Sequence, residues 1–201
     1  MKSRRKIIFY GDSNTYGYDP AEMVTARYPS DVRWTDLTAS RLADEWEVIP
    51  QGMNGRRLPE REYDFMRIKE MAASLAERDI FAVMLGTNDL ILTQRVDARP
   101  ALARMEHFLT VLTGLLSPGQ ILVIAPVRIG TEISGDPQHR LWWEESGRLN
   151  EGYKVLAEKY GVLFCDAATW QIPLAFDLVH FTEEGSRRFA DKMTDFLINC
   201  S

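Results

Sequence analysis

A serine near one end of the chain and an aspartate–histidine pair near the other are residue types that together perform acyl transfer. Ser13 lies in the polar segment 11–17 (GDSNTYG), and Asp177 precedes His180 by three residues in DLVH. A serine hydroxyl is a weak nucleophile and needs a base to take its proton. A carboxylate three residues before the histidine can turn back, fix the imidazole tautomer and stabilise the imidazolium. We therefore predict Ser13 as nucleophile, His180 as base and Asp177 as its orienting acid.

The chain has three histidines, and only one of them suits this role. His107 falls inside a segment with a helical pattern, where a packed or surface histidine is the ordinary interpretation. His139 follows Pro137 in a polar loop, where it is expected to be a surface residue. His180 alone has a carboxylate three residues before it in a loop expected at the active-site edge of the sheet, so it is the predicted base.

Two further polar loops could supply donors to a tetrahedral oxyanion. Gly55 lies in segment 51–57 (QGMNGRR) and Asn88 in segment 86–89 (GTND). Each loop alone is a common turn or helix cap. Glycine suits a site where the backbone approaches a ligand closely, and an asparagine amide offers two N–H donors without charge. We predict an oxyanion hole made by the backbone N–H groups of Ser13 and Gly55 and the Asn88 side chain.

Alternating strands and helices are predicted to position these loops. Five short apolar runs favour strands, and five segments with helical spacing lie between or after them. The expected strands are 6–10, 47–49, 80–85, 121–125 and 162–165, and the expected helices are 34–42, 61–75, 97–116, 141–160 and 183–198. This alternation predicts an α/β fold with a parallel sheet, whose strands carry the functional loops at their carboxyl ends.

Composition limits the class of protein. The chain has 201 residues, of which 45% are apolar and 26% charged, as expected for one globular domain spanning residues 1–201. A net charge of −5 disfavours a nucleic-acid partner. No apolar run is long enough to span a membrane or to serve as a secretion signal, so a cytoplasmic location without membrane insertion is expected. Two cysteines are too few for a disulfide framework or a zinc site.

Four blocks of the sequence together resemble the SGNH hydrolases, also called GDSL-type esterases and lipases. The family's serine, glycine, asparagine and histidine correspond here to Ser13, Gly55, Asn88 and His180, in the family's order. The segments RYPSDVRWT, EVIPQGMNGR and HFTEEG are most similar to the arylesterase and acetyl-esterase branch. The resemblance implies a flavodoxin-like three-layer α/β/α sandwich with a five-stranded parallel sheet, and activity without a metal or cofactor.

Two features depart from the family's usual pattern. The first block reads GDSN rather than GDSL, a substitution familiar in the arylesterase branch. The segment between Gly55 and Gly86 is short and lacks an insertion that builds subunit contacts in some relatives. The sequence does not decide between a monomer and a homo-oligomer.

The expected substrate is a small ester with a short acyl chain, either an aryl or an acetyl ester. Tyr16 and Val179 flank the predicted nucleophile and base, and they are candidates to line an acyl pocket. A carbohydrate acetylesterase is an alternative, in which Trp142 and Trp143 could stack on sugar rings. A lysophospholipase or thioesterase-type acylhydrolase is a further alternative, and an inactive binding module is disfavoured by the intact set of four blocks.

Overall fold

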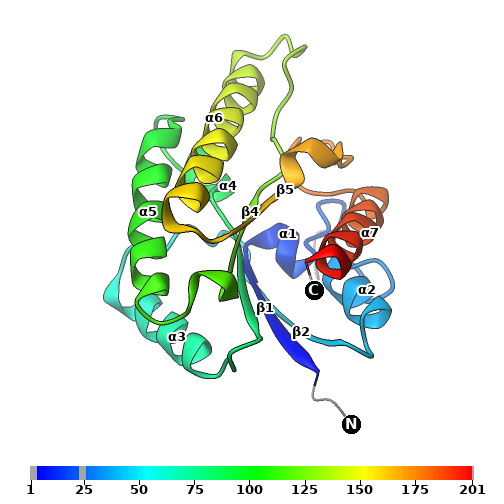
Figure 1. The fold of residues 1–201 in the computed structure, drawn as a ribbon. Coiled ribbons are helices and arrows are strands. Elements are labelled where there is room, and N and C mark those ends of the chain that lie inside the picture. Colours follow the sequence, from blue (N-terminus) through cyan, green and yellow to red (C-terminus); the bar gives the residue numbers. More distant parts are fainter. Residues whose placement is uncertain (1–3, 23–25, 201) are drawn as a thin grey trace.

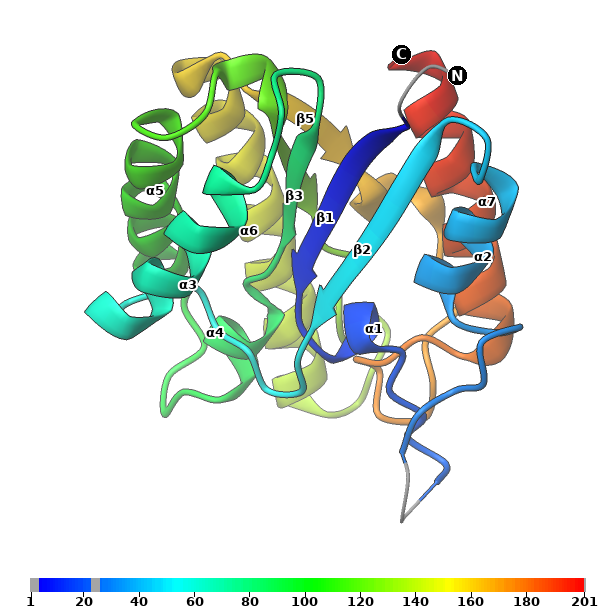
Figure 2. The same ribbon diagram turned by 90° about the horizontal axis from the view of Figure 1, so that it is seen from below.

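A parallel sheet of five strands runs through the computed structural model, which describes residues 4–22 and 26–200. The strand order is β2-β1-β3-β4-β5 (Figures 1 and 2). The strands are β1 (Arg5–Gly11), β2 (Trp46–Gly52), β3 (Ile80–Met84), β4 (Ile121–Ala125) and β5 (Leu163–Asp166). The runs IFAVM of β3 and ILVIA of β4 are buried along their whole length. Strands covered on both faces require such continuous apolar runs.

Helices cover both faces of this sheet (Figure 2). One face packs against α3 (Glu62–Ala73), α5 (Ala98–Thr113) and α6 (Pro137–Tyr160). The other face packs against α2 (Trp34–Arg41) and α7 (Glu183–Asn199). The predicted three-layer α/β/α sandwich is therefore confirmed.

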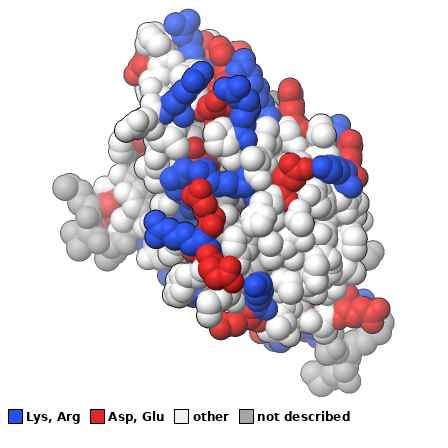
Figure 3. Space-filling view, turned by 90° about the vertical axis from the view of Figure 1, so that its left-hand side faces the viewer, with Lys and Arg blue, Asp and Glu red and all other residues white. Residues whose placement is uncertain are grey.

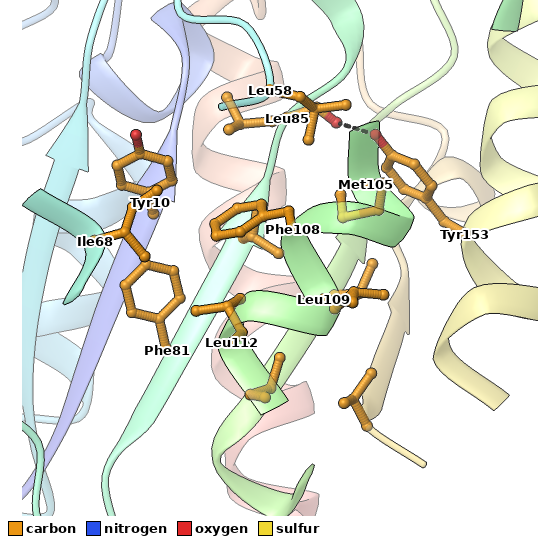
Figure 4. Close-up of a cluster of buried hydrophobic side chains, with 14 of the residues drawn as sticks. Tyr10, Leu58, Ile68, Phe81, Leu85, Met105, Phe108, Leu109, Leu112 and Tyr153 are labelled. Carbon is orange, nitrogen blue, oxygen red and sulfur yellow. Dashed lines mark hydrogen bonds between the residues drawn. The ribbon is translucent and has the colours of Figure 1, made fainter. Parts of the chain in front are cut away.

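Each face has its own aromatic core. On the α5 face, Tyr10 packs 5.7 Å from Phe81 between ring centroids, and Tyr153 donates a hydrogen bond to the Leu85 carbonyl at 3.1 Å (Figure 4). On the α7 face, the Trp34 ring lies between neighbouring aromatic rings at 4.8 and 4.7 Å. The two cores hold the strands from both sides, and this fixes where their carboxyl ends lie.

Several element bounds differ from the sequence expectations. Strand β2 extends beyond the expected 47–49 because it pairs with β1 along its whole length, from Arg5 opposite Trp46 to Gly11 opposite Gly52. Helix α6 begins at Pro137 rather than 141, since the Asp136 side chain accepts a hydrogen bond from the Gln138 N–H at 2.8 Å.

Four short helical segments were absent from the expectations. They are α1 (Ser13–Tyr16), α4 (Thr87–Ile91), η1 (Pro118–Gln120) and η2 (Ala167–Trp170). Segments of three to five residues are too short to show a helical period. Two of them, α1 and α4, begin directly after β1 and β3 and carry Ser13 and Asn88.

The end of β2 packs directly against α1. A Cβ atom added to Gly52 would lie 2.2 Å from the backbone nitrogen of Tyr16, so only glycine fits there. This contact holds the turn after β1 against the neighbouring strand. Among the helices of residues 4–22 and 26–200, none has the length and apolarity that crossing a bilayer requires.

Candidate active site

The carboxyl edge of the sheet brings Ser13, His180 and Asp177 into one hydrogen-bonded chain. Ser13 Oγ lies 2.9 Å from His180 Nε2, and His180 Nδ1 lies 2.6 Å from Asp177 Oδ2. Ser13 is the first residue of α1, and the other two belong to the loop before α7. All three predicted catalytic side chains therefore meet, although 167 positions separate the serine from the histidine.

The other oxygen of Asp177 closes a tight turn around the histidine. Asp177 Oδ1 accepts the backbone N–H groups of Val179 and His180, each at 3.0 Å. Leu178, which lies between Asp177 and Val179, has a φ of 59°, a left-handed value that non-glycine residues rarely adopt. Burial alone would raise the pKa of Asp177, but the hydrogen bonds from the His180 ring and from these two N–H groups outweigh it, so the pKa is lowered. The carboxylate is thus charged where it faces the imidazole.

Asn14 ties the serine turn to the histidine loop. Its side-chain Nδ2 donates to the Val179 carbonyl at 3.1 Å, and its Oδ1 accepts the Phe181 N–H at 3.0 Å. These two bonds grip the backbone on either side of His180. Its own carbonyl accepts the Trp34 indole N–H at 2.8 Å. The sequence shows Asn14 only as a variation within the GDSN block, and no signal there predicts a bond to a loop so far along the chain.

Asn14 is expected to act as a positioning residue. We expect Asn14→Leu, which keeps a similar volume but removes both hydrogen bonds, to lower kcat for an aryl acetate by about 10- to 100-fold. The loss should fall on kcat more than on KM, because the histidine is misplaced while the ester site is unchanged. Asn14→Asp retains only the acceptor, so its kcat should lie between those of wild type and Asn14→Leu. Equal rates of phosphonate labelling at Ser13 in wild type and Asn14→Leu would contradict the role.

Two tyrosines contact His180 and the residue that follows it. The Tyr18 ring lies 4.5 Å from the His180 ring between centroids. The Tyr28 hydroxyl donates to the Phe181 carbonyl at 3.2 Å. Neither contact follows from the sequence, because both residues lie in the irregular segment between α1 and α2.

Asp12 is buried beneath the turn that carries Ser13 and accepts a hydrogen bond from it. Its carboxylate accepts the Asn14 N–H at 3.0 Å, and the residue is 2% exposed. Burial raises its pKa to about 6, although the Asn14 N–H and the charge of His180 oppose the shift. This contact gives Asp12 a structural role, which is to hold the turn around Ser13.

The raised pKa of Asp12 has a consequence for stability. Its folded-state pKa of about 6 exceeds the reference value of 3.8, so the stability that it contributes is greatest below the reference value and is lost as the pH rises through 6. Asp12→Asn keeps a carbonyl oxygen for the Asn14 N–H but removes the buried charge. We subtract the unfolding free energy of wild type from that of Asp12→Asn, both measured in urea titrations. We expect this difference to rise by about 2 kcal/mol from about pH 4.5 to pH 7.5. A difference that does not vary with pH would contradict the expectation.

The predicted oxyanion donors have free N–H groups. Asn88 Nδ2 donates one hydrogen to the Arg56 carbonyl at 3.0 Å, which fixes the amide and leaves its second hydrogen available. The Ser13 N–H lies at the start of α1, where no intrahelical acceptor exists. Gly55 has a φ of 72°, and in the part of the chain that the structure describes its N–H has no hydrogen-bond acceptor. The loop is anchored nearby, since the Met53 N–H donates to the Gly11 carbonyl at 3.2 Å.

Asp89 and Arg56 hold the backbone near Gly55 and Asn88 through hydrogen bonds. Asp89 accepts the Leu58 N–H at 2.9 Å and pairs with Arg104 at 3.2 Å, and burial raises its pKa although these partners oppose the shift. The Arg56 guanidinium donates to the Gly11 carbonyl at 2.8 Å and also to that of Gln51. Asp89 therefore fixes the segment that carries Asn88 through its contacts with Leu58 and Arg104.

The substrate-binding candidates differ in their surroundings. Tyr16 is half-buried, with the Arg27 guanidinium 4.3 Å from its ring centroid. Val179 is 5% exposed, and its backbone carries the bonds to Asn14 and Asp177. Their role against an acyl group stays a prediction.

The tryptophan pair is partly exposed, and its role against a sugar ring stays a prediction. Trp142 and Trp143 are both only half-buried, and the guanidinium of Arg128 lies 3.6 Å from the Trp143 ring centroid. A further exposed aromatic is Phe176, which is 80% exposed and directly precedes Asp177. Within residues 4–22 and 26–200, no three His, Cys, Asp or Glu side chains gather as metal ligands would.

Comparison with known proteins decides the family. A profile of the GDSL-like lipase/acylhydrolase family matches residues 9–188, which contain all four blocks. The chain belongs to this family. The match confirms the SGNH resemblance and the prediction of a carboxylic ester hydrolase.

The solved structures of two esterases superpose on nearly the whole chain. Est24, a carbohydrate acetylesterase from Sinorhizobium meliloti, is 25% identical with a TM-score of 0.78, over 98% of this chain and 99% of its own. The aryl esterase of M. smegmatis is also 25% identical with a TM-score of 0.78, over 98% of this chain and 100% of its own. No curated sequence matched the chain. The GDSL-like fold is thus shared with esterases of two leaving-group classes.

Proposed function

We propose that this GDSL-like acylhydrolase cleaves short-chain carboxylic esters through Ser13, His180 and Asp177. The observation that carries the proposal is the unbroken chain of contacts from serine to histidine to aspartate, at 2.9 and 2.6 Å. These distances lie within the range that proton transfer from a nucleophile to its base requires. The similarity to an aryl esterase and an acetylesterase supports an aryl or acetyl ester as substrate.

Acylation begins when Ser13 Oγ attacks the ester carbonyl and His180 Nε2 takes the hydroxyl proton. Asp177 holds the Nδ1 proton and stabilises the imidazolium. The Ser13 and Gly55 N–H groups and the free Asn88 hydrogen receive the oxyanion. His180 returns its proton to the leaving alcohol, and the same histidine then activates water to release the acid.

A carbohydrate acetylesterase is a second candidate. Phe176 supports it, because an 80% exposed aromatic ring beside Asp177 can stack on a sugar ring. The similarity to a carbohydrate acetylesterase points the same way. In this version the leaving alcohol is a sugar hydroxyl and the three catalytic residues are unchanged.

A chain-length series of p-nitrophenyl esters tests the main proposal, with sugar acetates assayed beside it. We expect the highest kcat/KM with acetate and a decline as the acyl chain lengthens. Mass spectrometry should find an organophosphonate adduct on Ser13. Faster hydrolysis of sugar acetates than of aryl acetates, reduced by Phe176→Ala, would favour the second candidate. Absence of both turnover and adduct would refute both.

A further inference from the structure

A hollow separate from the triad lies between helix α3 and the loop that carries Gly55. Its volume is about 390 Å³, and none of the three catalytic residues lines it. The lining is basic, because it includes four arginines and two carboxylates. The arginines are Arg56, Arg57, Arg61 and Arg67. Figure 3 looks onto the side of the molecule formed by α3 and α5, where basic and acidic side chains alternate in a band beside a broad uncharged surface.

The two carboxylates of the lining are already engaged. Glu60 pairs with Arg104 at 3.4 Å, and Asp64 accepts the backbone N–H of Arg61 at 3.3 Å. In the described part of the chain, the guanidinium groups of Arg61 and Arg67 have no acidic partner. A backbone N–H leaves the charge of Asp64 in place, but four guanidinium groups against two carboxylates still leave the lining with net positive charge.

The side chain of Tyr10 lines the same hollow. Tyr10 is 7% exposed, its ring packs on Phe81, and the Arg56 guanidinium lies 4.2 Å from its ring centroid. Figure 4 shows the Tyr10 hydroxyl directed away from Phe81. Among residues 4–22 and 26–200 this hydroxyl has no hydrogen-bond partner, although Tyr10 lines the hollow. The Tyr10 oxygen is not among the fully buried unpaired side-chain atoms of the described residues, so it reaches the surface of the hollow, where it can donate to a ligand.

We propose that this hollow binds a compact anionic group, a carboxylate or a phosphate, through the Tyr10 hydroxyl and the guanidinium groups of Arg61 and Arg67. Guanidinium forms charge-assisted, two-pronged hydrogen bonds with such oxygens, and the volume suits a small ligand. Burial raises the pKa of Tyr10, so its hydroxyl remains a donor at neutral pH.

The position of the hollow gives the anion two sources. Gly55 lines it, so the anion lies beside the loop proposed to hold the oxyanion. The anion can be the acidic part of an ester whose carbonyl lies at Ser13, and this version rests on the proposed function. It can also be a free anion, which does not depend on ester hydrolysis. Both sources use the same three side chains.

Calorimetric titration with inorganic phosphate and with benzoate tests the site directly. Tyr10→Phe keeps the packed ring and removes only the hydroxyl, and Arg61→Gln/Arg67→Gln removes two exposed charges. We expect each variant to weaken binding of at least one anion by about tenfold or more. Lys69→Gln is the matched control, because Lys69 lies on α3 and pairs with Glu62 but does not line the hollow. It should bind like wild type.

A pair of esters of similar shape separates the two sources. We compare 4-carboxyphenyl acetate with 4-carbamoylphenyl acetate, which differ in charge, in wild type and in the double arginine variant. A loss of kcat/KM for the charged ester alone identifies a substrate group. Unchanged ester preference with weakened phosphate or benzoate binding identifies a free anion. If wild type and variants agree in both binding and ester preference, the anion site is refuted. If neither ester is hydrolysed while anion binding follows the variants, the site stands and the proposed function fails.

Discussion

Ser13→Ala is expected to lose nearly all esterase activity while keeping the wild-type fold. Removing the nucleophile of a serine–histidine pair costs about 10⁵- to 10⁶-fold in kcat in enzymes that use this chemistry. The residue is small and 6% exposed, and among the described residues its hydroxyl has a hydrogen-bond partner only in His180. The substitution therefore removes one hydroxyl without opening a cavity of consequence. The rates at which the variant and wild type hydrolyse p-nitrophenyl acetate measure the loss.

Two controls make the Ser13→Ala result decisive. Thermal unfolding should match wild type, which shows that the turn after β1 still forms. The variant should also fail to take up the organophosphonate label. If it retained a tenth or more of wild-type turnover, another nucleophile would be at work and the proposed mechanism would be wrong.

Asp177→Asn is expected to lower kcat by about 10⁴-fold, for a reason that the local hydrogen bonds make specific. The backbone N–H groups of Val179 and His180 both point at Oδ1, so an asparagine would keep its carbonyl oxygen there. Its NH₂ group would then face His180 Nδ1 and donate to it. The imidazole would carry its proton on Nε2, where it cannot accept one from Ser13.

Nitrogen NMR of His180 tests this reason separately from the rate. We expect the neutral ring to carry its proton on Nδ1 in wild type and on Nε2 in Asp177→Asn. Asp177→Ala serves as the comparison, because it removes the carboxylate without supplying a donor. A kcat within tenfold of wild type in Asp177→Asn would show that the carboxylate does not orient the base.

The strands that the sequence predicts best are those whose burial is uniform. The runs IFAVM and ILVIA lie in the middle of the sheet, so every position is apolar, and β4 matches its expected bounds. Strand β2 is an edge strand in which Glu47 and Pro50 are exposed, so its pattern breaks up and only its centre was expected. The pairing partner, rather than the residues of β2 themselves, sets its full length.

The site was predictable as far as residue type restricts it. A chain with three histidines leaves few candidates for a base. Two of them have a carboxylate three positions earlier, and of these only His180 lies in a loop at the expected active-site edge. Asn14 and Tyr18 were not predictable as partners of the histidine loop, since amide and phenol side chains are common and their contacts exist only in the folded chain. The solvent exposure of Phe176 and the partial cover over Trp143 likewise depend on neighbours from other elements.

In the proposed mechanism, the wide separation of Ser13 and His180 along the chain makes activity depend on synthesis at least as far as His180. While the ribosome is still adding residues before position 180, the serine has emerged but has no base, so the nascent polypeptide is inert toward the esters around it. A break in the backbone anywhere between the two, followed by loss of either piece, would likewise silence the hydroxyl. Turnover thus reports on the integrity of the whole stretch between them, rather than on the turn that holds the nucleophile.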